Sequence, residues 1–169
     1  KVIISYMEVY NEQIRDLLTS EKPTASLDLR EDRVKGCVVA GLSEHYPSNA
    51  QEVIDLLRKG TERRAMFATA ANPHSSRSHA VFQVMIEQRP RTADIRAQVK
   101  FSKLSLIDLA GSERAAVTQN RGARLVEGAN INKSLLALAN CINALGKKTS
   151  SSSSSSSSTY IPYRNSKLT

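Results

Sequence analysis

Two short polar segments contain residue types that can bind a nucleoside triphosphate. The first is Ser75-Ser76-Arg77-Ser78-His79, and the second runs from Asp108 to Glu113 with the sequence Asp-Leu-Ala-Gly-Ser-Glu. Nucleoside triphosphatases use an aspartate at the end of an apolar strand to hold Mg²⁺ through water, and glycine lets a backbone N–H approach a terminal phosphate. Serine hydroxyls are hard oxygen ligands that suit Mg²⁺ or orient an attacking water. The two segments together predict a sensor of the γ-phosphate.

Taken singly, each of these residues has a plainer interpretation. Asp108 alone is typical of a strand end or a turn, the serines of a loop or a kinase site, and Arg77 with Glu113 of an ordinary surface pair. Three histidines with serine and aspartate also suggest a hydrolase triad, but the sequence contains no G-x-S-x-G elbow. Only the combination of the two segments favours the phosphate sensor.

The elements beside the two segments determine whether they can meet. Residues 80–86 alternate in apolar character and predict one strand, and residues 104–109 predict a second, more uniformly apolar strand. Residues 88–100 between them are polar and too few for a crossover helix with its loops, so we predict antiparallel pairing. The start of one strand then lies beside the end of the other, and Arg77 can reach Glu113.

The N-terminal half predicts further strands and one helix. Residues 1–9 read as a strand followed by a short helical segment at residues 14–18, and residues 27–30 and 37–40 read as two short strands. Ser48 with Gln51 three residues later is a capping-box pattern, and apolar spacing predicts a helix from there to Gly60.

The C-terminal half predicts one long helix. Apolar residues recur at steps of four and three over residues 127–145, and Gly146 is expected to end the helix before two lysines. This predicted stripe consists of Ile131, Leu135, Leu138, Ile142 and Leu145. A serine run from Ser150 to Ser158 follows and predicts a solvated loop over residues 149–159, and Asn165 is expected to cap a further helix.

Composition limits the class of protein. The chain has 169 residues, 40% hydrophobic and 24% charged, which indicates one globular domain without a membrane-spanning run. Its two cysteines, Cys37 and Cys141, lack zinc-site spacing and fit a reducing cytosol. A net charge of +8 attracts polyanions, so nucleic acid, acidic membrane and acidic protein surfaces all remain possible on charge alone. The chain starts at Lys1 within an apolar stretch, and we expect it to be a piece of a longer protein.

Five segments in family order resemble the kinesin motor domain. Asn72 with S-S-R-S-H resembles the first switch of that family, L-I-D-L-A-G-S-E-R at residues 106–114 the second, and E-G-A-N-I-N-K-S-L at residues 127–135 the relay helix. Residues 8–18 and 160–169 match an earlier strand and a later segment. The resemblance implies an α/β fold of the P-loop NTPase type, with a mixed central sheet flanked by helices and truncated at both ends. Residues 1–169 would be the C-terminal portion of a motor domain, without its phosphate-binding loop.

The resemblance also implies residue roles in an ATPase. Ser76 would ligate Mg²⁺, Ser75 would position the lytic water, and Arg77 would form a salt bridge with Glu113 behind the γ-phosphate. Asp108 would hold a Mg²⁺-bound water, and the N–H of Gly111 would sense the γ-phosphate. The implied cofactors are ATP and Mg²⁺, and the implied cofactor-binding residues are Asn72, Ser75, Ser76, Asp108 and Gly111.

The family resemblance assigns the positive charge to a microtubule partner. The loop after the second switch, the relay helix and the segments beyond it contact tubulin in kinesins. The implied contact residues are Arg121, Arg124, Asn132, Lys133, Lys147, Lys148, Arg164 and Lys167. Nucleic acid ranks second because no aromatic-rich RNA platform accompanies these cations, and membrane insertion is not expected.

Within the family, residues 120–122 and 141–145 most resemble the eighth kinesin class. The resemblance implies a cytoplasmic protein on microtubules, and a homodimer with coiled coil elsewhere in the full chain. Because the sequence contains no G-x-x-x-x-G-K-S/T loop, we expect the isolated chain to bind ATP weakly and to be inactive. Two alternatives stay open: a kinesin-like module that binds microtubules without turnover, and another nucleotide-switch branch such as myosin.

Overall fold

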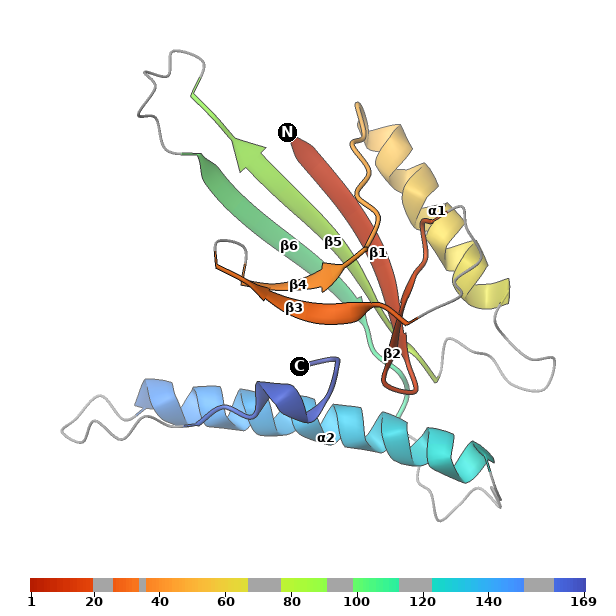
Figure 1. Ribbon diagram of the computed structural model, residues 1–169, viewed down its shortest axis with the longest axis vertical. Helices are drawn as coiled ribbons and strands as arrows, with labels where there is room; N and C mark the ends of the chain where they lie inside the picture. The colour runs from red at the N-terminus through yellow and green to blue at the C-terminus, as the bar shows by residue number, and fades with distance from the viewer. Residues whose placement is uncertain (20–25, 34–35, 67–76, 91–98, 113–122, 151–159) are drawn as a thin grey trace.

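The structure is a computed structural model of residues 1–169 (Figure 1). It describes residues 1–19, 26–33, 36–66, 77–90, 99–112, 123–150 and 160–169, without the side chains of residues 123, 124 and 148–150. The described elements, in chain order, are β1 (Val2–Tyr10), β2 (Gln13–Asp16), β3 (Asp28–Asp32), β4 (Gly36–Ala40), α1 (Ala50–Met66), β5 (His79–Gln88), β6 (Lys100–Asp108), α2 (Ala123–Ser150) and the 3₁₀ helix η2 (Tyr163–Asn165).

The centre of the molecule is a four-stranded sheet with the order β2-β1-β5-β6. All three neighbouring pairs are antiparallel, and Ala80 of β5 lies opposite Asp108 of β6. The predicted antiparallel pairing of these two strands is therefore confirmed. The described strands include no parallel pair, so only the antiparallel part of the expected mixed sheet is seen.

Both faces of β1 are covered, because its side chains alternate between two apolar clusters. One cluster joins Ile4 and Tyr6 of β1 to residues of β5 and to the α1 side chains Val53 and Leu56. The other joins Met7 and Val9 to the separate β3–β4 hairpin through Leu29, Val39 and Leu42. The sheet thus lies between α1 on one face and the hairpin on the other, while α2 crosses the end of the sheet (Figure 1).

Residues 14–18 do not form the short helical segment that the sequence predicted. Residues 13–16 form strand β2, which pairs with β1 across a tight turn at Asn11 and Glu12, whose φ angles are 51° and 60°. Side-chain hydrogen bonds then fix the chain after β2: Asp16 Oδ1 accepts from Leu18 N–H at 2.7 Å, and Oδ2 accepts from Ser43 N–H at 2.7 Å. Apolar spacing alone did not reveal this turn, because neither residue is a glycine.

Helix α1 differs from the prediction at both ends. Asn49 is its capping residue, since Asn49 Oδ1 accepts the backbone N–H of Glu52 at 2.9 Å, while Glu52 Oε2 accepts the N–H of Ser48 at 2.8 Å. The capping pair is therefore Asn49 with Glu52 rather than Ser48 with Gln51. The helix also continues through Gly60, where a Cβ would overlap the Tyr6 ring. Gly60 permits close packing on β1 rather than ending the helix.

Helix α2 is longer than predicted and buries a different face. It continues past Gly146 to Ser150, and its most buried residues are Ile131, Ser134, Ala137 and Cys141. Ile142 and Leu145 of the predicted stripe are 59% and 41% exposed. Asn165 likewise does not cap a helix, because it is the last residue of η2. The serine run at residues 151–158 lies outside the described residues.

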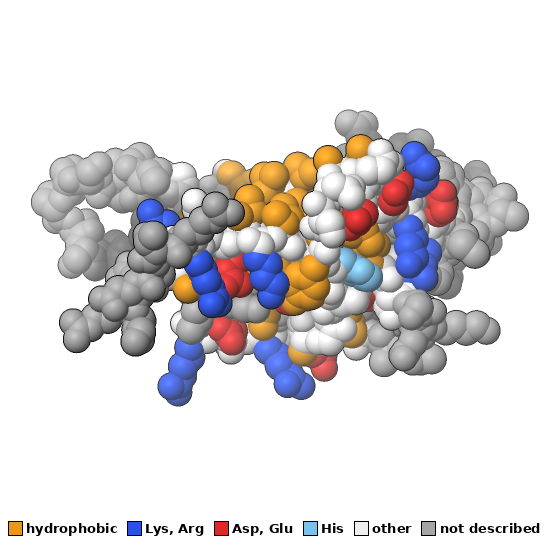
Figure 2. Space-filling model, turned by 90° about the horizontal axis from the view of Figure 1, so that it is seen from above, with side chains coloured by type: hydrophobic (Ala, Val, Ile, Leu, Met, Phe, Trp, Pro, Cys, Tyr) orange, Lys and Arg blue, Asp and Glu red, His pale blue; other side chains and the backbone are white. Residues whose placement is uncertain are grey.

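Strand β6 lies at the outer edge of the sheet and is exposed along its whole length. Leu104, Leu106 and Ile107 are each more than half exposed. Hydrophobic side chains also reach the surface on the face shown in Figure 2. Among the described residues, no strand pairs with the outer side of β6.

Candidate functional site

The predicted site residues that the structure describes lie at one rim of the sheet. Arg77 precedes the first residue of β5 by two positions, and Asp108 is the last residue of β6, opposite Ala80. Gly111 follows on the exposed continuation of β6. The register thus brings the Arg77 and Asp108 segments to the same end of the sheet. Four other site residues lie outside the described residues, namely Asn72, Ser75, Ser76 and Glu113.

Asp108 is held by an arginine that the sequence analysis did not identify. Arg64 Nη1 contacts Asp108 Oδ2 at 2.6 Å, while Arg64 Nη2 donates to Ser78 O at 2.8 Å and Arg64 Nε donates to Ser78 Oγ at 3.1 Å. The Arg64 side chain is only 6% exposed, whereas that of Asp108 is 68% exposed. A buried guanidinium therefore ties the start of β5 to the end of β6. Arg63 and Arg64 lie beyond the predicted end of the helix at Gly60, and only the observed α1 places them in its last turn.

A second carboxylate lies on the inner side of Arg64. Glu8 is fully buried in β1, and its Oε1 lies 3.9 Å from Arg64 Nε. Arg15 on β2 approaches the other oxygen of Glu8, also at 3.9 Å. Buried carboxylates are retained where cations compensate them. Arg64 therefore links the sheet interior to the open rim.

Arg77 contacts the relay-like helix α2 among the described residues. Its Nη1 lies 3.0 Å from Glu127 Oε2, and Tyr10 donates its hydroxyl to Glu127 Oε1 at 2.8 Å. Burial, together with the hydrogen bond to Glu127, raises the pKa of Tyr10. The predicted partner of Arg77, Glu113, lies outside the described residues, and among those described the Arg77 guanidinium contacts Glu127. Glu127 was part of a recognised motif, but no local pattern indicated this long-range contact.

His79 joins three elements through its ring. Its Nδ1 accepts the backbone N–H of Ala110 at 3.1 Å, and its Nε2 lies 2.8 Å from Ser134 Oγ on α2. Ser134 donates its hydroxyl to Ile131 O at 2.7 Å. Burial lowers the pKa of His79, and the neutral ring fits these contacts.

The rim fits a hydrated cation and a phosphate better than a protein-only metal cage. Asp108 is exposed, so its carboxylate can accept hydrogen bonds from metal-bound water, and Gly111 presents exposed backbone beside it. The described residues contain no group of three or more His, Cys, Asp and Glu side chains placed to hold a metal. This donor set matches Mg²⁺, which keeps several waters and is held by few carboxylates together with substrate phosphates.

Cations of the predicted track-binding set gather at α2 and η2. Lys133, Arg164 and Lys167 line one open cleft of about 890 Å³, and Lys133 and Lys147 are exposed on α2. The Arg164 side chain is 91% exposed, while Asn132 is half-buried. Arg121 and the side chains of Arg124 and Lys148 lie outside the described part of the chain.

The turn between β1 and β2 fixes this cationic surface to the sheet. Glu12 Oε1 accepts the hydroxyl of Ser166 at 2.7 Å, and its Oε2 accepts the N–H of Lys167 at 2.9 Å. Asn11 accepts a side-chain hydrogen bond from Asn130 of α2. Asn11 and Glu12 both have left-handed backbone conformations, which non-glycine residues adopt at a cost in free energy. One turn therefore holds both α2 and the C-terminal segment.

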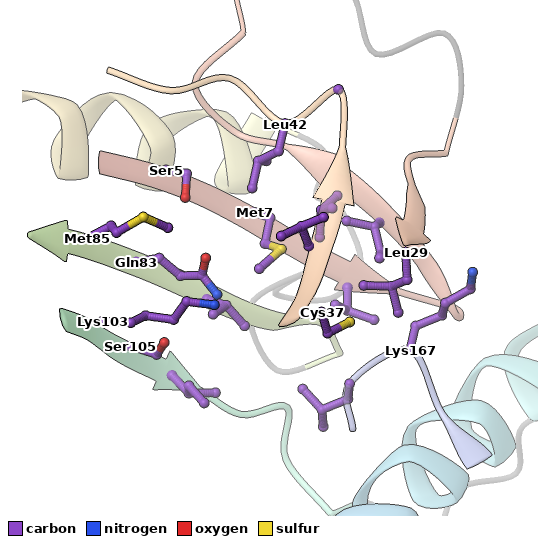
Figure 3. Close-up of a pocket in the computed structure, with 18 of the residues that line it drawn as sticks. Ser5, Met7, Leu29, Cys37, Leu42, Gln83, Met85, Lys103, Ser105 and Lys167 are labelled. Atoms are coloured by element: carbon purple, nitrogen blue, oxygen red, sulfur yellow. The ribbon is translucent and has the colours of Figure 1, made fainter. Parts of the chain in front are cut away.

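A separate cavity of about 500 Å³ lies between the sheet and the β3–β4 hairpin (Figure 3). Met7, Leu29 and Leu42 contribute apolar side chains, and Lys103 and Lys167 lie toward its edges. Neither Arg77 nor Asp108 lines this cavity. The candidate site at the rim is therefore separate from this cavity, whose lining also includes polar residues such as Gln83 and Ser105.

The described sheet and helices place the chain in the α/β class, and comparison with solved structures is more specific. A kinesin with ADP on a microtubule, described as KIF14, matches with a TM-score of 0.82 and 37% identity over 99% of this chain and 47% of that chain. A fast kinesin matches with a TM-score of 0.77 and 43% identity over 99% of this chain and 44% of that chain.

The chain belongs to the kinesin family, because the family described as kinesin motor domain matches residues 1–169. It is 54% identical to kinesin-like protein KIF18A of Mus musculus over 98% of this chain and 18% of that protein. It is 53% identical to kinesin-like protein KIP3 of Saccharomyces cerevisiae over 100% of this chain and 20% of that protein. These relatives confirm the predicted likeness to the eighth class. The chain spans about a fifth of the length of these curated relatives.

No helix among the described residues is both long and apolar enough to span a membrane.

Proposed function

We propose that the protein is a microtubule-based motor that couples ATP hydrolysis to microtubule binding and movement. In this proposal the chain supplies both switch segments and the track-binding elements. The observation that carries the proposal is the rim, where the Arg77 and Asp108 segments lie at one end of the sheet and Arg77 contacts Glu127 of α2. Related kinesin structures are described as complexes with a microtubule, which supports the same partner here.

The switch residues act by position and charge rather than as covalent nucleophiles. Bound Mg²⁺ supplies charge neutralisation at the phosphates, and Ser76 and Asp108 are the residues that would hold it. Ser75 orients the attacking water, and the Gly111 N–H donates to the γ-phosphate. Arg77 closes behind that phosphate through its pair with Glu113.

Arg64 keeps Asp108 in place for this role. Because the Arg64 guanidinium is almost fully buried and also bound to Ser78, it fixes the Asp108 carboxylate relative to the start of β5. A positioned carboxylate loses less entropy when it binds a hydrated cation. We therefore assign Arg64 the role of a positioning residue, which acts through Asp108.

The cationic surface on α2 and η2 supplies the track contacts. Lys133, Lys147 and Arg164 are exposed and can meet an acidic tubulin surface, together with the other residues of the predicted set. Such contacts weaken as ionic strength rises. We further propose that the protein acts in the cytoplasm on microtubules, and that the full-length protein is a homodimer.

The test is microtubule-stimulated ATP hydrolysis by the complete motor domain. We expect microtubules to accelerate turnover of the wild type, and Glu113→Ala to lower turnover by about 100-fold, because it removes a partner that closes the site. Ser102→Ala, at an exposed position on β6, is the matched control and should keep wild-type turnover. Microtubule binding without turnover by the wild type would instead identify a non-catalytic module, and full turnover by Glu113→Ala would overturn the proposed pair.

A further inference from the structure

We infer that His79 is a positioning residue that transmits the position of the Ala110–Gly111 peptide to α2. The inference rests on the proposed function, since it assigns a route between nucleotide sensing and track binding. It draws only on described residues: His79 on β5, Ala110 after β6, and Ser134 on α2.

The contacts allow one arrangement of protons. Backbone N–H can only donate, so Nδ1 of His79 must be the unprotonated acceptor facing Ala110 at 3.1 Å. The proton of the neutral ring is then on Nε2, which donates to Ser134 Oγ at 2.8 Å. The Ser134 hydroxyl proton is directed to Ile131 O at 2.7 Å. Each group in this chain of three hydrogen bonds has a defined role.

All three residues are shielded from water. His79 is 3% exposed, Ser134 is 2% exposed and Ala110 is 5% exposed. A buried hydrogen bond that is lost leaves its donor or acceptor unsatisfied, which is costly. The ring therefore resists any change in the distance between the Ala110 peptide and α2. Burial is the largest cause of the lowered pKa of His79, and the Arg64 charge lowers this pKa further, while the Glu12 and Asp108 charges raise it.

The three contact points are adjacent to residues with proposed functions. Arg77 lies two residues before His79, and Gly111 directly follows Ala110. On α2, Lys133 is adjacent to Ser134, is exposed and belongs to the proposed track-binding set. A shift of the peptide at residues 110–111 on binding a γ-phosphate must move α2 or break the His79 link. His79 thus joins the phosphate sensor to the track-binding helix by a single side chain.

Amide substitutions can separate the two contacts of the ring. In His79→Asn the side-chain oxygen occupies the δ position and can still accept from Ala110, but it cannot reach Ser134. In His79→Gln the amide group extends to the ε position and can donate to Ser134, but it lacks the δ acceptor. Ser134→Ala removes one oxygen from α2 and retains a residue that favours helix. Ser134→Ala therefore remains informative if a His79 variant fails to fold.

The measurement is the microtubule dissociation constant of the complete motor domain with ADP and with a non-hydrolysable ATP analogue. The ratio of the two constants reports the coupling. We expect Ser134→Ala and His79→Asn each to reduce this ratio by about three- to tenfold, as for loss of one buried hydrogen bond. The double variant that combines Ser134→Ala with His79→Asn should show no further reduction of the ratio, because both changes break the same link. His79→Gln should reduce the ratio by breaking the link at Ala110. Ser102→Ala is the control and should retain the wild-type ratio.

Three results would overturn the inference: an unchanged ratio in folded Ser134→Ala, an unchanged ratio in folded His79→Gln, or reductions that multiply in the double variant. These results differ from failure of the proposed function, which would appear as a wild-type protein with no nucleotide-dependent microtubule binding. Thermal unfolding of each variant identifies those that fold.

Discussion

The two sides of the sheet differ in how they are held. β1 and β6 have nine residues each and both are rich in apolar side chains, yet β1 is largely buried between α1 and the hairpin, whereas β6 is exposed throughout. The proposed chemistry is nevertheless at the end of β6. Polar links from other elements, Arg64 to Asp108 and His79 to Ala110, hold that end. Apolar burial stabilises one side of the sheet, and directed polar contacts position the other.

The largest expected effect is on the free energy of unfolding of the 169-residue chain. Matched leucine-to-alanine substitutions compare the two sides of the sheet. Leu17 is fully buried in the cluster beneath β1, and Leu106 of β6 is 54% exposed. We expect Leu17→Ala to lower the free energy of unfolding by about 2–5 kcal/mol and Leu106→Ala by less than about 0.5 kcal/mol. Urea denaturation measures both.

Repeating the pair in the complete motor domain sharpens the comparison. If Leu106→Ala lowers the free energy of unfolding clearly more in the complete motor domain than in the 169-residue chain, a segment outside this chain covers β6. Equal costs of the two substitutions within the 169-residue chain would contradict the difference between the two sides.

A smaller effect is expected from removing the polar link at Arg64. Arg64→Met keeps much of the apolar stem but loses the hydrogen bonds to Ser78 and the contact with Asp108, at a cost of about 2 kcal/mol. Arg58→Met, at an exposed position of α1, is the control and should be close to neutral. Chemical denaturation of both variants is the measurement, and equal stability of the two would show that Arg64 does not hold the rim.

Local sequence patterns correctly predicted the features of the fold that depend on local sequence. Alternation and the short polar connection gave β5, β6 and their antiparallel pairing, which brings the Arg77 and Asp108 segments to one rim. The resemblance to kinesins supplied the residue roles, which stay predictions, and the family match confirms the resemblance itself.

The errors arose where distant residues decide the structure. Residues 13–16 became a strand because a left-handed turn at Asn11 and Glu12 pairs them with β1. The buried face of α2 differs from the predicted stripe because it includes the polar Ser134, whose hydroxyl contacts His79 on a distant strand. Arg64 and Glu127 act through contacts between elements far apart in sequence, and no spacing rule indicates such contacts.

The most direct test of the central claim is a double-mutant cycle at the rim. It compares microtubule-stimulated ATP turnover of the complete motor domain for Arg77→Ala, Glu113→Ala and the double variant. If the two switch segments act as one unit, the double variant should turn over about as slowly as the slower single variant. If the two losses instead multiply, Arg77 and Glu113 act independently, and the account of a jointly formed phosphate sensor is wrong.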